Sequence, residues 1–421
     1  MDQFIVEGGF PLSGEVQVSG AKNSALKLLA ATLLIEGSVE ISNVPDLMDI
    51  RTMIKVLKTL GADVEYDSSK QFCKIDATNL NQIRAPYDLV KTMRASFQVM
   101  GPLLARKGRA EISQPGGCSI GPRPVDFHLK AFEEMGATVV LDHGYICASA
   151  PSGGLRPSHI ILDFPSVGTT ENVIMASVFC DGKTILENAA REPEIQDLAN
   201  FLVSCGAQIS GAGSDRIEIT GVTRLKGCKH RVMPDRIEAG TYVLASCISK
   251  SNLKINEFPV GSLDLFLDKL KACGNRFEIQ ENSVKVFPSD RPSAIQFTTR
   301  PHPGLATDLQ APMMAYLATV EGVSTVSEGV YENRFLHIAE LNRMGAEIQL
   351  EGNTALVNGV SKLSAAPVMA CDLRAGAAMV LAALVAEGTT KISRVYHIDR
   401  GYERMESKLN ELGAKIRRIK E

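Results

Sequence analysis

One loop combines a reactive side chain with residues that prevent regular secondary structure. The segment from Gln114 to Pro124 reads QPGGCSIGPRP, in which three glycines and three prolines surround Cys118, and Arg123 follows five residues later. Prolines and glycines at this density exclude a helix interior or a central strand, so we expect an exposed loop. A thiol in such a loop is open to oxidation, and it is therefore either a bystander or a working group.

Charged residues recur where the sequence pattern predicts that helices begin. The starts of six first helices carry Lys22 with Asn23, Arg94, Thr169 with Thr170, Asp235 with Arg236, Asp308, and Asp372 with Arg374. The starts of six second helices carry Asp46, Arg123, Glu192, Gly261, Arg334 and Arg400. The N-terminus of a helix favours anions and disfavours cations, so capping cannot explain six of these residues: Lys22, Arg94, Arg123, Arg334, Arg374 and Arg400. They are either solvated charges in local ion pairs or anion ligands, and their matched positions favour anion binding.

The acidic residues at these positions have a simpler interpretation. Asp235, Asp308 and Asp372 each stand where a helix cap or first-turn acid is expected. In a site that binds polyanions, however, a carboxylate can also act as a base or accept hydrogen bonds from hydroxyl groups. Asp308 follows a rigid proline-rich entry, residues 301–304, and both roles stay open for it.

A sixfold repeat must position these side chains. Six amphipathic runs each close on a glycine, at Gly61, Gly136, Gly206, Gly274, Gly345 and Gly413, and a short alternating strand follows each of them. A glycine directly after a helix indicates a left-handed C-terminal residue. With an earlier helix in each unit, one repeat of about 70 residues reads helix, strand, helix, strand and a further strand. Such alternation predicts crossover connections and mixed α/β layers.

Composition and motifs exclude several classes of function. The 421 residues suggest two or three domains, and the net charge of −3 gives no argument for nucleic-acid binding. We find no apolar run of membrane-spanning length, no signal peptide, no metal-ligand spacing and no nucleotide-binding glycine loop. The nine scattered cysteines suggest a reducing, cytoplasmic location. We therefore expect no metal, no cofactor, no nucleic acid, no membrane and no obligate protein partner.

Eight motifs, in order, carry a resemblance over essentially the whole chain. They are SGAKNSALKLLAATLL at 19–34, TMRAS at 92–96, PGGCSIGPRPVDFH at 115–128, PSVGTTEN at 165–172, PDRIEAGTY at 234–242, TDLQAP at 307–312, ENRFLH at 332–337 and HIDRGYE at 397–403. With these motifs the chain resembles the UDP-N-acetylglucosamine enolpyruvyl transferase family. The resemblance implies a two-lobed α/β fold of six βαβαββ repeat units, three per lobe, arranged as an inside-out α/β barrel.

The resemblance also implies how the chain divides. Residues 1–21 and 234–421 are expected to form the lobe that contains both termini, and residues 22–233 the lobe that carries the cysteine loop. Two crossing strands are expected to join the lobes, with the active site in the cleft between them.

The implied reaction transfers the enolpyruvyl group of phosphoenolpyruvate to the 3′-hydroxyl of UDP-N-acetylglucosamine and releases phosphate, the first committed step of peptidoglycan synthesis. By resemblance, Cys118 protonates C3 of phosphoenolpyruvate and is alkylated by phosphonate epoxides such as fosfomycin, while Asp308 takes the proton of the sugar hydroxyl. Lys22, Arg123 and Arg400 would hold the anionic groups of phosphoenolpyruvate, with Arg334 and Arg374 assisting. The resemblance assigns the UDP-sugar to Asn23, Arg94, Arg123, Pro124, Val125, Asp126, Phe127, Ser166, Val167, Gly168, Asp308 and Val330, and we add Asp372 to the substrate-binding set.

One departure and two alternatives remain. Some family members carry a lysine where this chain has Phe164, which puts a side-chain contact to the uridine diphosphate there in doubt. The first alternative is the sister transferase that acts on shikimate 3-phosphate, although that family lacks the cysteine loop. The second is a non-catalytic clamp of six units that binds nucleic acid, which the net charge of −3 disfavours.

Overall fold

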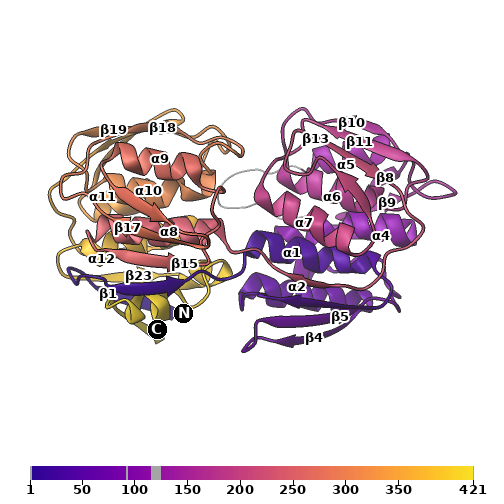
Figure 1. The fold of residues 1–421 in the computed structure, drawn as a ribbon, viewed down its shortest axis with the longest axis horizontal. Coiled ribbons are helices and arrows are strands. Elements are labelled where there is room, and N and C mark those ends of the chain that lie inside the picture. Colours follow the sequence, from indigo (N-terminus) through magenta and orange to yellow (C-terminus); the bar gives the residue numbers. More distant parts are fainter. Residues whose placement is uncertain (1, 92, 115–124, 421) are drawn as a thin grey trace. The chain divides into compact units, whose positions relative to one another are not determined.

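The computed structural model describes residues 2–91, 93–114 and 125–420 (Figure 1). Cys118, Arg123 and Pro124 therefore lie outside the described residues. The described chain divides into two compact units. The terminal unit comprises residues 2–19 and 234–420, and the middle unit comprises residues 20–114 and 125–233.

The middle unit contains three successive sets of helices and strands. The first set is α1 (Lys22–Ala31), the 3₁₀ helix η1 (Thr32–Leu34), β3 (Ser38–Ser42), α2 (Met48–Leu60), β4 (Asp63–Asp67) and β5 (Phe72–Asp76). The second is β6 (Arg84–Ala85), α3 (Tyr87–Val90), η2 (Arg94–Val99), α4 (Met100–Lys107), β7 (Arg109–Ser113), α5 (Asp126–Glu134), β8 (Thr138–Asp142) and β9 (Tyr145–Ser149). The third is β10 (His159–Ile161), α6 (Val167–Ser177), β11 (Lys183–Glu187), α7 (Pro193–Ser204), β12 (Gln208–Ser210) and β13 (Arg216–Thr220), and β14 (Lys229–Arg231) follows it.

The terminal unit repeats this plan. It begins with β1 (Asp2–Glu7) and β2 (Gly14–Gln17) and continues with α8 (Arg236–Ile248), β15 (Leu253–Asn256), α9 (Asp264–Ala272), β16 (Arg276–Ile279) and β17 (Ser283–Phe287). Next come β18 (Gln296–Thr298), η3 (Thr307–Leu309), α10 (Gln310–Leu317), β19 (Val323–Ser327), α11 (His337–Arg343), β20 (Glu347–Glu351) and β21 (Thr354–Asn358). The last set is β22 (Pro367–Met369), α12 (Leu373–Val385), β23 (Thr389–Ser393), η4 (Val395–Arg400), α13 (Met405–Glu411) and β24 (Lys415–Lys420).

The strands form six four-stranded sheets with one common topology. Their orders are β14-β3-β5-β4, β6-β7-β9-β8 and β10-β11-β13-β12 in the middle unit, and β2-β15-β17-β16, β18-β19-β21-β20 and β22-β23-β1-β24 in the terminal unit. In every sheet the first two strands are parallel and the remaining pairs are antiparallel, as in β18-β19-β21-β20. The sixfold βαβαββ repeat predicted from the sequence is confirmed, and all six of its helix-closing glycines have positive φ, as expected.

Three strands pair far from their neighbours in the chain. β2 precedes α1 in sequence but pairs in parallel with β15, and β14 precedes α8 but pairs in parallel with β3. β1 completes the sheet of β23 and β24. Residues 2–19 are also tied to the terminal unit by buried side chains, because the Ser19 amide donates to Glu238 and the Ser19 hydroxyl accepts from Lys408, at 2.6 and 2.7 Å.

Each unit places helices inside and sheets outside. All thirteen residues of α8 are buried, and α12 and α6 are buried along most of their length, which is expected only of helices surrounded on all sides. The strands instead alternate buried and accessible residues, as in β11 and β21, so one face of each sheet packs on the helices. The inside-out arrangement predicted for each unit is confirmed (Figure 1). Among the described helices, none has both the length and the apolar character needed to cross a membrane.

Candidate active site

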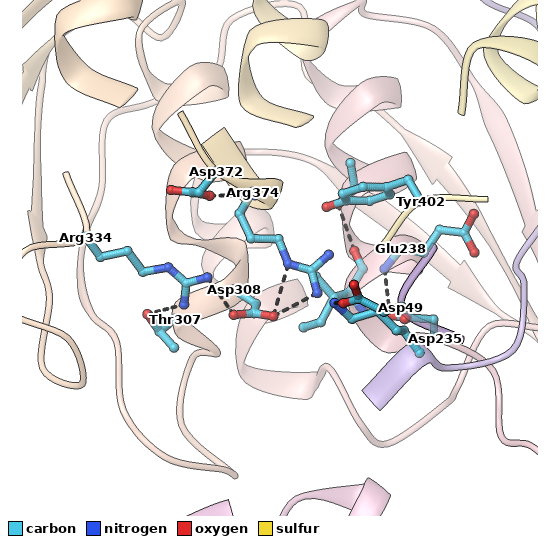
Figure 2. A network of polar contacts seen from close by, with 12 residues as sticks. Asp49, Asp235, Glu238, Thr307, Asp308, Arg334, Asp372, Arg374 and Tyr402 are labelled. Carbon is cyan, nitrogen blue, oxygen red and sulfur yellow. Dashed lines mark hydrogen bonds and ion pairs between the residues drawn. The ribbon is translucent and has the colours of Figure 1, made fainter. Parts of the chain in front are cut away.

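A carboxylate held between two arginines is the central feature of the terminal unit. Asp308, in η3, accepts hydrogen bonds at Oδ2 from Nε and Nη2 of Arg374, at 3.0 and 2.8 Å. Its other oxygen, Oδ1, lies 2.7 Å from Nη2 of Arg334. Figure 2 shows the two guanidinium groups on opposite sides of this carboxylate. Three of the predicted site residues are thus brought into direct contact, although they are up to 66 residues apart in sequence.

Helix caps and a small polar chain fix the two arginines. Asp372 caps α12 by accepting from the backbone N–H of Arg374 and Ala375, at 2.7 and 2.9 Å, so capping, the simpler of its two interpretations, is confirmed. On the other side, Nη1 of Arg334 donates to the Thr307 hydroxyl, which donates to Glu328, both at 2.9 Å. The helix cap thus holds the backbone of Arg374, and the Thr307 hydroxyl holds the guanidinium group of Arg334.

The cluster concentrates charge in a region that excludes most water. The Arg334 and Arg374 side chains are 6% and 2% exposed, and that of Asp308 is 25% exposed. Burial alone would raise the pKa of Asp308, but Arg374 and Arg334 outweigh it and hold the pKa well below its usual range. Nη1 of Arg374 is buried and has no hydrogen-bond partner in the described part of the chain. An unmet buried donor is costly, so the cluster has capacity for one more acceptor oxygen.

Aromatic and acidic groups surround the far side of Arg374. Its guanidinium carbon lies 5.2 Å from the centre of the Tyr402 ring, within the range of a cation–π contact. Asp235 caps α8 through the amides of Ile237 and Glu238, at 2.8 and 3.0 Å, so capping is confirmed for this residue as well. Arg400 ends η4 and is half-buried, rather than starting the helix that follows.

The middle unit presents a second group of predicted residues at the start of α1. Lys22 is the first residue of α1, and its Nζ lies 3.1 Å from Asp49 Oδ2. Asn23 follows it and is half-buried. The hydroxyl of the next residue, Ser24, donates to Asp197, which also accepts from His230 at 2.8 Å. The first turn of α1 contains no acid, so a cation is held at the end of the helix where anions are favoured.

The start of α6 is built around close backbone contacts. The Ser166 hydroxyl caps the helix by accepting from the backbone N–H of Thr169 at 3.3 Å. The Gly168 carbonyl accepts from the side-chain amide of Gln98 at 3.2 Å. A Cβ added at Gly168 would lie 3.0 Å from Gln98 Nε2 and 3.3 Å from the His128 ring, so a larger residue there would displace both. The segment 166–168 is therefore fixed by its neighbours before any ligand binds.

His128 is held in one neutral form beside this segment. Asn172 Oδ1 accepts from the Gly101 amide, so its Nδ2 is the donor that faces His128 Nδ1 at 3.0 Å. Nδ1 is then an acceptor, and the ring proton lies on Nε2, next to Gly168. Burial, with the nearby charge of Arg94, lowers the pKa of His128 to about 3. The ring therefore remains an uncharged hydrogen-bond donor at neutral pH.

The remaining predicted residues are placed as follows. Val125 is buried just before α5, Asp126 is exposed in its first turn, Phe127 is half-buried, and Phe164 is 39% exposed. The Val330 amide donates to Glu328 at 2.8 Å. In the middle unit, the described residues of the predicted set lie at the starts of α1, η2, α5 and α6. No group of three or more histidines, cysteines or acids that could hold a metal ion occurs among the described residues.

Several supporting residues were missed by the sequence reasoning. Thr307 and Glu328 orient Arg334, while Gln98, His128 and Asn172 fix the start of α6. Thr307, His128 and Asn172 lie inside the motifs TDLQAP, PGGCSIGPRPVDFH and PSVGTTEN. Their positions in these motifs could have indicated that they belong to the site. Glu328 and Gln98 lie outside those motifs. Glu328 contacts Thr307, which is 21 positions away, and Gln98 contacts Gly168, which is 70 positions away.

Comparison with known proteins agrees with this architecture. A family model described as EPSP synthase (3-phosphoshikimate 1-carboxyvinyltransferase) matches residues 6–409. Proteins named UDP-N-acetylglucosamine 1-carboxyvinyltransferase from Geobacter metallireducens and Saccharophagus degradans are 52% and 50% identical, and each match covers 100% of both chains. The enolpyruvyl transferase NikO from Streptomyces tendae superposes with a TM-score of 0.91 at 27% identity, covering 99% of each chain. EPSP synthase from Acinetobacter baumannii, at TM-score 0.77, 15% identity and 100% of each chain, shows the same fold. The resemblance and the fold class predicted from the sequence are confirmed.

Replacing Asp308 by asparagine is expected to destabilise the terminal unit, because Arg334 and Arg374 lose their counter-charge. We expect the free energy of unfolding to fall by about 2–4 kcal/mol at neutral pH, a range lowered because Asp308 is partly exposed. Since the folded-state pKa of Asp308 is depressed, its contribution is complete above the unfolded pKa of about 4 and is lost as pH falls through the lower folded value. Urea unfolding between about pH 3 and about pH 8 measures this difference.

The matched control is Asp268→Asn in the same unit. Asp268 pairs with Lys271 at 3.0 Å, but both side chains are more than half exposed, so little change in stability is expected. Equal stability losses in the two variants, or a loss for Asp308→Asn that does not shrink as pH is lowered below about 4, would contradict the role assigned to the buried cluster.

Proposed function

This chain belongs to the EPSP synthase (3-phosphoshikimate 1-carboxyvinyltransferase) family of enzymes, and from that premise we propose that it transfers the enolpyruvyl group of phosphoenolpyruvate to the 3′-hydroxyl of UDP-N-acetylglucosamine. A proton adds to C3 of phosphoenolpyruvate while the sugar oxygen bonds to C2. Loss of a proton from C3 then expels phosphate and restores the double bond. The names of relatives that are about half identical over the full length support this acceptor.

The observation that carries the proposal is the pair of buried arginines that face Asp308, Arg374 from the start of α12 and Arg334 from the turn before α11. Phosphoenolpyruvate carries a phosphate and a carboxylate, and planar guanidinium groups suit both anions. The unpartnered Nη1 of Arg374 supports a further acceptor oxygen at this cluster. In this assignment Arg334 and Arg374 assist, while Lys22, Arg123 and Arg400 hold the two anionic groups.

The middle unit supplies most of the UDP-sugar contacts. Backbone N–H groups at the start of α6 suit a diphosphate, because a helix N-terminus attracts anions. Asn23, Arg94 and the segment 123–127 are assigned to the same substrate, together with Val330, Asp308 and Asp372 of the terminal unit. Phe164 offers no cation here, which leaves the diphosphate to backbone donors and to arginine.

Asp308 is assigned as the base, and its ion pairs bear on how it can act. A carboxylate whose pKa lies well below its usual range accepts a proton poorly. Substrate anions that bind Arg334 and Arg374 compete with Asp308 for the positive charge of the same guanidinium groups. Binding of phosphoenolpyruvate therefore weakens the contacts that hold the pKa of Asp308 down, and the base gains strength only when a substrate is present.

The proposed reaction is the first committed step of peptidoglycan synthesis, and its setting is the cytoplasm. Eight free cysteines among the described residues suit a reducing compartment. Cys118 is assigned as the proton donor to C3, and a thiol serves there if its pKa lies near the working pH.

An acceptor assay tests the substrate directly. Purified protein with phosphoenolpyruvate is expected to release phosphate when UDP-N-acetylglucosamine is added, because the proposed site matches a nucleotide sugar. The control reaction contains shikimate 3-phosphate in place of the sugar nucleotide. Release of phosphate with shikimate 3-phosphate alone would overturn the assigned acceptor.

The role of Cys118 is tested by alkylation. Incubation with fosfomycin followed by peptide mass analysis is expected to find one adduct, on Cys118, formed faster when UDP-N-acetylglucosamine is present. Cys118→Ser is expected to lose the adduct and about 100-fold or more of kcat, in line with the loss of a positioned acid. Near-normal turnover by this variant removes the thiol from the mechanism.

Asp308→Asn is expected to lose about 100-fold or more of kcat, because asparagine cannot take the proton of the sugar hydroxyl. The assay is run where circular dichroism shows the variant folded, so that lost activity is separated from lost stability. Asp268→Asn, whose side chain is 64% exposed, serves as the control and should keep its turnover. A kcat for Asp308→Asn close to that of the parent protein would refute the assignment of the base.

A further inference from the structure

Two cysteines of the middle unit lie in unusually close contact. The sulfur atoms of Cys205 and Cys228 are 3.2 Å apart. Cys205 directly follows α7 as its C-cap residue and is 2% exposed, whereas Cys228 directly precedes β14 and is half-buried. Of the eight cysteines in the described residues, these are the two whose sulfur atoms are in contact. One thiol is thus protected and its partner can be reached from solvent.

The two thiols differ in how readily they lose a proton. The Cys205 thiol donates toward Cys228, and this hydrogen bond lowers the pKa of Cys228, with a further contribution from the nearby His230. The same hydrogen bond, together with burial, raises the pKa of Cys205. Since the thiolate is the nucleophile, Cys228 is the one that reacts first with an oxidant. Cys205 then stands next to the oxidised sulfur.

We propose that Cys205 and Cys228 form a reversible disulfide, which makes this pair a redox modification site separate from the site of enolpyruvyl transfer. The Cys228 thiolate attacks a peroxide oxygen, the O–O bond breaks, and a sulfenic acid and hydroxide result. Cys205 attacks the sulfenic sulfur, the S–S bond forms, and its proton and the hydroxyl group leave as water. Both sulfurs are oxidised, the peroxide is reduced to water, and a cellular dithiol can reverse the reaction.

The pair is connected to the start of α1. Cys228 is two residues from His230, which bonds to Asp197 at 2.8 Å. Asp197 also accepts from Ser24, the third residue of α1, and from the Met233 amide at 3.3 Å. Disulfide formation draws two sulfurs from 3.2 Å to bonding distance, and the movement acts on the short strand β14 that carries His230. A disulfide here is therefore connected, through the hydrogen bonds of His230, Asp197 and Ser24, to the residue next to Asn23 in α1.

Peptide mapping of the full-length protein tests the proposal without any substrate, so its outcome does not depend on the proposed function. Reduced protein is treated with hydrogen peroxide, free thiols are alkylated, and the protein is digested with trypsin. The expected product joins residues 192–216, which contain Cys205, to the tripeptide 227–229, which contains Cys228. Treatment with dithiothreitol before alkylation should release both peptides in alkylated form.

Cys228→Ser and Cys205→Ser are expected to lose the cross-linked peptide, while Cys371→Ser keeps it. Cys371 is a fair control because it is also half-buried, and its thiol contacts backbone carbonyls instead of a thiol. Circular dichroism checks that each variant is folded. The proposal is overturned if Cys205 and Cys228 both stay alkylatable in peroxide-treated parent protein, or if Cys228 is oxidised without joining Cys205.

Discussion

The need to neutralise two buried arginines shapes the proposed site in the terminal unit. Arg334 and Arg374 are almost completely enclosed, and a charge removed from water is tolerated only beside an opposite charge and enough hydrogen-bond acceptors. Asp308 supplies the charge, and the Thr307 hydroxyl, oriented by its hydrogen bond to Glu328, supplies a further acceptor. Such a cluster does little for stability compared with packed hydrophobic side chains. In the proposed function, its value lies in holding two anion-binding groups in place before the anion arrives.

The repeat explains how one backbone plan serves different purposes. Asp235 caps α8 at its start. At the start of α12, Asp372 caps the helix and Arg374 follows two residues later. The starts of α1 and η2 instead carry Lys22 and Arg94, without a side-chain cap. A helix start in this fold therefore carries a side-chain cap, a cation or both, and in the proposed function the cations at these starts bind substrate.

The sequence indicated the elements better than the contacts between them. A helix-closing glycine and a following alternating strand are local signals, so the six repeats could be found from Gly61 to Gly413. The resemblance then located Asp308, Arg334 and Arg374. The roles of Glu328 and Gln98 depend on folding that joins distant segments, and no spacing in the sequence reports them. Arg400 was expected to start a helix, but it ends η4, because helix boundaries are the least certain part of a pattern.

Buried charge behind the start of α6 extends the same logic to the middle unit. Glu171 is fully buried, which raises its pKa to about 7 despite Lys27 at 3.4 Å. Apolar residues in place of both Glu171 and Lys27 would be expected to cost little in stability, whereas removing Glu171 alone leaves Lys27 without its counter-charge. The carboxylate instead accepts from Gln98 at 3.1 Å, and the same amide group holds the Gly168 carbonyl. The Glu171 carboxylate thereby orients the Gln98 side-chain amide, which fixes the backbone proposed to bind the diphosphate. Burying this charge destabilises the core, but it positions the proposed site more precisely.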